Sequence, residues 1–307
     1  MTVDLAARLR EIIARPLPLP GSGETFVRWE KLAGYCIEDI ATGRLVEAHG
    51  DADAILYEID GRRAAVGELW GVWAAEPPKP VLTATPVGDH WRLEGTKLWC
   101  SGASLCTHAL VSAIDGDKPR LFTVDLRQDG VHPGSGTWAN VGMRAADTES
   151  VSFRGVPAQA VGGPASYLER PGFWHGAIGV AACWYGGAVA VSEALKDRLY
   201  KADPHQLAHM GAVDAALAGA RWSLMAAATE IDADPRDENG QAQLRARRVR
   251  VIVENAATVA IEHVGRALGA GPLCQDARHA QRVADLTVYL RQSHGDADLA
   301  DLAGLLT

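Results

Sequence analysis

Apolar side chains recur at helical spacing along the first 68 residues of the chain. The spacing predicts an amphipathic helix over residues 3–14, which ends before Pro16 because proline cannot continue the hydrogen-bond ladder of a helix. It also predicts a second helix over residues 24–42 and a third over part of residues 44–60. We therefore expect residues 1–68 to form a short N-terminal helical lobe.

Residues 69–165 have a different pattern. Runs rich in Val, Thr and Trp alternate with turn signals built from Gly, Pro and Asp. This spacing predicts a β domain that folds as an antiparallel β-barrel or sandwich of about six to eight strands. Inside it, residues 91–94 alternate apolar and polar positions, and Gly95 and Thr96 indicate a turn into a second strand that carries Trp99.

Residues 166–307 return to helical spacing. The stretch from Phe173 to Arg198 is almost free of charge until Glu193, so we expect this helix to be buried on most of its faces. Further helices are predicted over residues 204–231, 241–268, 276–292 and 296–305. An N-terminal helical lobe, a middle β domain and a C-terminal helical bundle together define an α+β fold.

The composition argues against several classes of partner. The chain has 307 residues and a net charge of −8, so we expect no nucleic-acid partner bound through its phosphates. No apolar run reaches the roughly 20 residues of a membrane span, and the N-terminus lacks the apolar core of a signal peptide, so no membrane association is expected. Five cysteines without CxxC spacing predict free thiols, no zinc site and a cytoplasmic location.

Four segments resemble, in the expected order, motifs of the acyl-CoA dehydrogenase superfamily. They are residues 72–77 (VWAAEP), 95–103 (GTKLWCSGA), 142–157 (GMRAADTESVSFRGVP) and 266–271 (RALGAG). Counting onward from the last segment places Asp285 on the family's "RD" aspartate. The resemblance implies an acyl-CoA dehydrogenase-like fold that binds FAD between the β domain and the C-terminal bundle and assembles as a dimer or tetramer. It also implies an FAD-dependent oxidoreductase that oxidises the Cα–Cβ bond of an acyl thioester, so acyl-CoA is the candidate small-molecule substrate.

The resemblance also implies a set of flavin-binding residues. They are Trp73, Ala75, Trp99, Ser101, Arg266, Gly269 and Ala270. Trp99 would lie against the isoalloxazine ring and Ser101 would place its hydroxyl near N5, where a hydrogen bond tunes the flavin's redox potential. The Ala75 peptide would face the pyrimidine edge without the family's usual threonine hydroxyl. Gly269 and Ala270 would let a neighbouring subunit's backbone approach the ADP portion, and Arg266 would either pair with pyrophosphate or cap its own helix.

The base that dehydrogenation requires is missing from its usual position. The family's glutamate falls on Ser293, which cannot act as a carboxylate base. His175 lies near a second position that some members use, and His294 follows Ser293 directly, with Asp296 as an orienting partner. Histidine suits proton transfer near neutral pH. For each histidine a simpler interpretation remains open: a buried neutral side chain for His175 and an exposed loop side chain for His294.

Two further patterns are weaker. His205 and His209 share a helix face at i, i+4 spacing that can bind metal, but without a third ligand we expect a solvated face. Four arginines between residues 245 and 250 are likewise expected to form a solvated face or an intersubunit contact.

Two alternative functions stay open. One is a non-catalytic or half-site subunit that assembles with a homologue supplying the glutamate. The other is a flavin monooxygenase-like member, in which no base for dehydrogenation is needed and histidines near the flavin steer oxygen chemistry.

Overall fold

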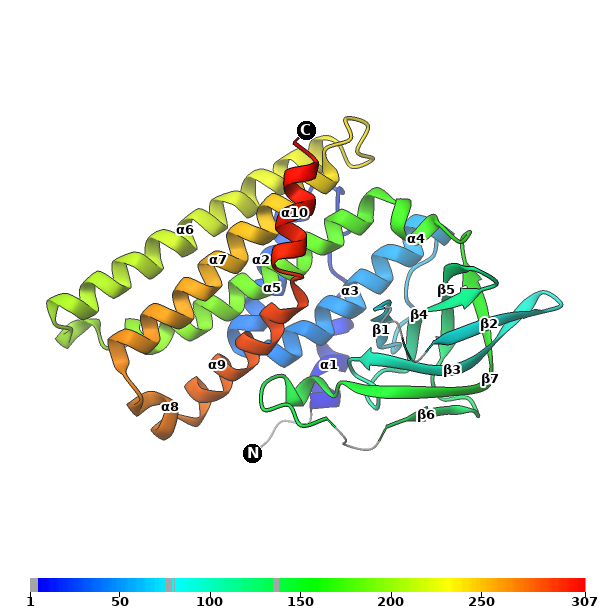
Figure 1. The fold of residues 1–307 in the computed structure, drawn as a ribbon, viewed down its shortest axis with the longest axis horizontal. Coiled ribbons are helices and arrows are strands. Elements are labelled where there is room, and N and C mark those ends of the chain that lie inside the picture. The colour runs from blue at the N-terminus through cyan, green and yellow to red at the C-terminus, as the bar shows by residue number, and fades with distance from the viewer. Residues whose placement is uncertain (1–4, 76–78, 80, 135–137, 307) are drawn as a thin grey trace. The chain divides into compact units, whose positions relative to one another are not determined.

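A computed structural model describes residues 5–75, 79, 81–134 and 138–306 (Figure 1). The chain divides into two compact units, which we call the β unit and the helical unit. The β unit comprises the described residues within Met1–Pro16, Leu45–Asn140 and Arg144–Phe173. The helical unit comprises the described residues within Leu17–Arg44, Val141–Met143 and Trp174–Thr307. The predicted α+β class is confirmed, while the predicted boundaries after residues 68 and 165 stay predictions.

The described strands of the β unit form a closed barrel with two added strands. The strands are β1 (Trp70–Trp73), β2 (Leu82–Val87), β3 (His90–Cys100), β4 (His108–Asp115), β5 (Lys118–Asp125), β6 (Val131–Pro133) and β7 (Glu149–Val161). The sheet runs β4-β2-β3-β7-β5, and antiparallel pairing of β5 with β4 closes it. β1 pairs with β4 in parallel and β6 with β7 antiparallel. The predicted β-barrel is therefore confirmed.

The predicted turn at Gly95 and Thr96 is wrong. Both residues lie inside one continuous strand, β3, where Gly95 pairs with Leu82 of β2 and Phe153 of β7. Gly95 has a φ of +123°, and a Cβ at this position would lie 2.5 Å from the carbonyl oxygen of Val81. The glycine therefore marks a close approach of two backbones rather than a turn.

Helices cover part of this barrel. The described helices of the β unit include α1 (Leu5–Ile13), most of α3 (Ile40–Asp60) and the short α4 (Ser166–Glu169). Ile55 and Leu56 of α3 are buried against Trp70 of β1 and Leu110 of β4. The apolar face of α3 therefore closes one side of the barrel.

The helical unit contains most of the described α-helices. They are α2 (Thr25–Glu38), α5 (Pro171–Lys196), α6 (Pro204–Ala233), α7 (Ala242–Leu268), α8 (Gly271–Gln275), α9 (Ala277–Tyr289) and α10 (Asp296–Gly304). The predicted helix over residues 24–42 ends early because Asp39 is extended, and α3 begins at the next residue. Backbones of α2 and α5 pack closely, since a Cβ on Gly186 would collide with the backbone of Ala33.

The apolar helix predicted from Phe173 onward is buried as expected. Among the described residues, one helical stretch, Pro171–Lys201, is long and apolar enough to cross a membrane by length and composition alone. Inside the protein, however, 72% of its most apolar window is buried. A buried core helix passes the same test, so the stretch is weak evidence for a membrane span.

Candidate functional site

Trp99 is the most unusual residue of the β unit. Its φ is +62°, in the left-handed region that bulky side chains rarely adopt, and 55% of its surface is exposed. The register between β3 and β7 shifts between Lys97 and Cys100, so the strand bulges at the point where the indole turns outward. The ring of Trp138 packs edge-on against it, with 4.4 Å between centroids. Backbone strain and an exposed aromatic side chain at one position are typical of a ligand-binding site.

Ser101 lies two residues beyond Trp99 and is held on both sides. Its hydroxyl is 3.1 Å from the Thr148 hydroxyl, and its carbonyl accepts a 3.0 Å hydrogen bond from the indole N–H of Trp73. Trp73 is buried, so its N–H positions the Ser101 backbone. The structure thus gives Trp73 a supporting contact, while the direct flavin contact expected of it stays a prediction.

The two motif segments of the β unit meet at this point. The backbone N–H of Gly102 donates to the carbonyl of Ala146, and that of Ala103 donates to Asp147. The Asp147 carboxylate in turn accepts hydrogen bonds from the backbone and hydroxyl of Ser104, both at 2.7 Å. Ala146 and Asp147 therefore brace the segment that carries Trp99 and Ser101.

The first residues of the segment 142–157, Gly142 and Met143, belong to the helical unit and contact α9 there. The Met143 N–H donates to a carboxylate oxygen of Asp285, which also accepts a 2.8 Å hydrogen bond from Gln281. A Cβ on Gly142 would collide with the Ala284 carbonyl oxygen, so only glycine fits. Burial raises the pKa of Asp285, although both hydrogen bonds lower it. The "RD" aspartate thus anchors the segment 141–143.

The other predicted flavin ligands have local contacts of their own. Ala75 is exposed just beyond β1. The Arg266 guanidinium is exposed and paired with Glu262 at 2.5 Å. Gly269 has a φ of +66° and ends α7, as C-terminal glycines commonly do, and Ala270 precedes α8. Their predicted contacts with a flavin or a partner subunit stay predictions.

The two candidate histidines lie in different environments of the helical unit. His175, in the first half of α5, is buried. His294 precedes α10 with 80% of its side chain exposed. Its backbone N–H donates to Asp298 at 3.0 Å, and its ring Nδ1 lies 3.7 Å from the same carboxylate. The expected partner Asp296 is thus replaced by Asp298, which the first turn of α10 brings over the histidine.

Sequence reasoning missed the carboxylate beside Ser293. The Ser293 hydroxyl donates a 2.6 Å hydrogen bond to Glu254 of α7 and accepts one from the Gly295 N–H at 3.2 Å. Arg291 pairs with the other oxygen of Glu254 at 3.6 Å. Glu254 lies 39 residues before Ser293 in the sequence, and nothing in its neighbourhood along the chain marks it. A carboxylate therefore stands next to the family's base position, although it comes from another helix.

Two of the four arginines between residues 245 and 250 of α7 do not belong to the expected solvated face. Arg245 is buried and pairs with Glu230 at 2.8 Å. Arg247 pairs with Asp298 and also with Asp301 of α10, at 3.0 and 2.8 Å. The solvated-face prediction is therefore wrong for Arg245 and Arg247, because their guanidinium groups bind carboxylates of neighbouring helices, whereas Arg248 is exposed. The alternative of an intersubunit contact stays a prediction. Arg247 and Asp298 together fasten the helix that follows His294.

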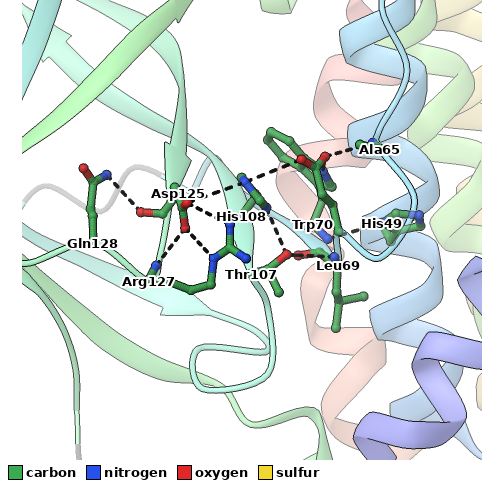
Figure 2. A network of polar contacts seen from close by, with 10 residues as sticks. His49, Ala65, Leu69, Trp70, Thr107, His108, Asp125, Arg127 and Gln128 are labelled. Carbon is green, nitrogen blue, oxygen red and sulfur yellow. Dashed lines mark hydrogen bonds and ion pairs between the residues drawn. The ribbon is translucent and has the colours of Figure 1, made fainter.

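A polar network at one edge of the barrel was not predicted (Figure 2). The His108 ring stacks on Trp70 with 4.8 Å between centroids, and its Nε2 lies 3.6 Å from Glu68 and 4.0 Å from Asp125. Burial lowers the pKa of His108, while the two carboxylates oppose this effect. The backbone N–H of Trp70 donates a 3.3 Å hydrogen bond to Nδ1 of His49 on α3. The network joins β1, β4 and β5 to the helix that covers them.

Two cavities occur away from these residues. One, of about 220 Å³, lies in the helical unit between α2, α5 and α6, with Trp29, Tyr185 and Arg221 in its lining. The other, of about 190 Å³, lies in the β unit beside Ser112 and Tyr167. The predicted site residues line neither cavity.

Comparison with known proteins supports the superfamily. Residues 76–156 match the family model described as the acyl-CoA dehydrogenase middle domain. None of the curated protein sequences compared with the chain matches it. Solved structures match along nearly the whole length at low identity, and the fold is therefore acyl-CoA dehydrogenase-like. The resemblance inferred from the four motifs is confirmed at this level.

Three solved structures illustrate the likeness. TdsC from Paenibacillus sp. A11-2, in complex with FMN and indole, is 17% identical with a TM-score of 0.78, covering 98% of this chain and 94% of that one. A nitrososynthase from Micromonospora carbonacea var. africana is 17% identical with a TM-score of 0.82, covering 98% and 88%. The methanesulfinate monooxygenase MsuC from Pseudomonas fluorescens is 18% identical with a TM-score of 0.75, covering 99% and 96%.

Proposed function

We propose that this chain is a flavin-dependent monooxygenase that acts on a small molecule and uses FMN. The observation that carries the proposal is Trp99, an exposed indole on a strained backbone beside the Ser101 hydroxyl. Serine at position 293 supports oxygen chemistry over dehydrogenation, because a monooxygenase does not need the carboxylate base that this position usually supplies. The structural likeness to a monooxygenase with bound FMN and indole supports the same choice.

The residues present fit a flavin at the β unit. The exposed face of Trp99 matches the flat tricyclic ring, and Ser101 adds a hydroxyl that can hydrogen-bond to a ring nitrogen. FMN fits better than FAD, since the only cation that the motifs offered to a pyrophosphate, Arg266, is already paired with Glu262. We therefore replace the expected FAD by FMN as the proposed cofactor.

A bound reduced flavin supplies two electrons to O₂, so that one oxygen atom enters the substrate and the other leaves as water. The chain's own residues hold the ring and move protons. Trp99 would lie against the flavin ring and exclude water from that face, and Thr148 keeps the Ser101 hydroxyl in place. We keep His294 as the candidate for proton transfer, because its imidazole is exposed and its backbone N–H donates to Asp298.

Binding of reduced FMN under anaerobic conditions tests the proposal. Trp99→Ala and Ser101→Ala should weaken binding, whereas Trp222→Ala should not, since Trp222 is an even more exposed indole on α6 with no proposed role. If Trp99→Ala and Trp222→Ala bound reduced FMN as tightly as the wild type, the assignment of the ring to Trp99 would be wrong.

Acyl-thioester dehydrogenation is the second candidate, and Glu254 is the observation that favours it. Its carboxylate, hydrogen-bonded to Ser293, stands beside the family's base position. Bleaching of a bound oxidised flavin by an acyl-CoA in the absence of oxygen, abolished in Glu254→Gln, would establish this candidate. Absence of bleaching with FMN bound would exclude it.

We also propose a homo-oligomer, dimer or tetramer, in the cytoplasm. The five cysteines, all of them among the described residues, form no disulfide, and four of them are buried, which suits a reducing compartment. Light scattering of the purified chain tests the oligomer, and a monomer at micromolar concentration would refute it.

A further inference from the structure

His209 and His263 form a pair that the sequence could not show. His209 lies on α6 and His263 on α7, which run side by side (Figure 1). Their Nδ1 atoms are 3.0 Å apart, and their ring centroids are 5.0 Å apart at an interplanar angle of 77°. The next contact along the helices, from the Gln206 side chain to the Ala267 carbonyl at 3.1 Å, fixes this register. Both histidines are partly exposed, so ions in solution can reach them.

The distance of 3.0 Å between the two nitrogens is compatible with either a shared proton or a shared metal ion. Two imidazole nitrogens at 3.0 Å can share one proton, with one ring donating and the other accepting. A metal ion with bonds of about 2.1 Å to two adjacent ligands at a right angle also places those ligands about 3.0 Å apart. Such an ion would lie beside the line that joins the two nitrogens, so both rings would turn to point their lone pairs at it, while the two helices could keep their spacing.

We propose that His209 and His263 bind one divalent transition-metal ion, of the class that prefers imidazole nitrogen, such as Ni²⁺, Cu²⁺ or Zn²⁺. Across the described residues, no group of three or more His, Cys, Asp and Glu side chains is arranged to hold a metal. The pair therefore supplies two ligands, and water completes the coordination. The ion joins the first half of α6 to the last turns of α7 and requires neither flavin nor substrate.

Calorimetric titration with NiCl₂ tests the site, using the full chain without a polyhistidine tag. The wild type should bind one Ni²⁺ per chain, and His209→Ala and His263→Ala should each weaken binding by about tenfold or more. His205→Ala is the matched control, because it removes a histidine from the same helix and leaves the pair intact; its affinity should stay within about twofold of the wild type. Far-UV circular dichroism verifies that each variant is folded.

Two further readouts separate this site from binding elsewhere. The affinity should fall as the solution is acidified, because imidazole binds metals only in its neutral form. Cu²⁺ bound to the wild type should show hyperfine coupling to imidazole nitrogen in its electron paramagnetic resonance spectrum, and the His209→Ala, His263→Ala double variant should lose it. Unchanged Ni²⁺ binding in the double variant, or loss of binding in His205→Ala alone, would overturn the proposal.

Discussion

Substitutions of Trp99 can distinguish the strain that its backbone imposes on the folded state from the proposed role of its indole in flavin binding. A left-handed backbone at a residue other than glycine costs about 1–2 kcal/mol, which Trp99→Ala keeps and Trp99→Gly removes. Glycine also lowers the free energy of unfolding by about 0.5–1 kcal/mol relative to alanine, because it loses more backbone freedom on folding. Both variants lose the edge-on contact with Trp138, worth about 0.5–1.5 kcal/mol. Trp99→Gly should therefore be more stable than Trp99→Ala by about 0.5–1 kcal/mol and close to the wild type.

Both substitutions of Trp99 should weaken flavin binding, even though Trp99→Gly leaves the stability close to that of the wild type. Stacking of a planar ring on an aromatic side chain is worth about 1–3 kcal/mol, so both variants should bind reduced FMN about 5- to 150-fold more weakly. Urea unfolding measures the stability of each variant, and anaerobic fluorescence titration measures the affinity. A Trp99→Gly protein that keeps wild-type FMN affinity, or that is less stable than Trp99→Ala, would refute the reasoning.

Three further predictions concern the segments that support the site. Gly142→Ala should destabilise the protein by about 1–3 kcal/mol because its methyl group meets the backbone of α9, whereas Gly219→Ala, with open space around it inside α6, should stabilise by about 0.5–1 kcal/mol; urea unfolding measures both. Asp285→Asn should gain stability relative to the wild type as pH rises above about 4, because burial raises the pKa of Asp285 in the folded state and ionisation is therefore costly there. Asp298→Asn should show the opposite trend. Burial raises the pKa of Asp298, but the His294 N–H and nearby arginines hold it lower overall. The stability that the Asp298 carboxylate gives the wild type should therefore be present at neutral pH and lost as pH falls below about 4. Thermal unfolding between about pH 3 and pH 7 measures both trends, and equal trends for the two variants would contradict them.

The fold was predictable from the sequence to a large extent. Long helices with apolar stripes, such as the one from Phe173 onward, differ clearly from the short runs of the barrel, so the order of elements could be inferred. Two local errors have physical reasons. Gly95 indicated a turn, but a close approach of the Val81 backbone requires glycine within a strand. The helix over residues 24–42 showed continuous spacing, but Asp39 is extended and caps the helix that follows.

The candidate site was predictable only where it follows the motifs. Trp99 and Ser101 were identified because they are close in sequence and have distinctive chemistry. Trp138 and Glu254 were missed because each contacts the site residues only through folding, across 39 residues in both cases: from Trp99 to Trp138 and from Glu254 to Ser293. Long-range side-chain pairs of this kind leave no periodic signal in a single sequence.

Equilibrium binding of flavins to the purified chain, measured without oxygen, tests the central proposal most directly. Reduced FMN should bind at one molecule per chain, more tightly than FAD, and the bound oxidised flavin should keep its colour when acyl-CoA is added. No binding of reduced FMN, or bleaching of a bound flavin by acyl-CoA, would contradict a flavin-dependent monooxygenase.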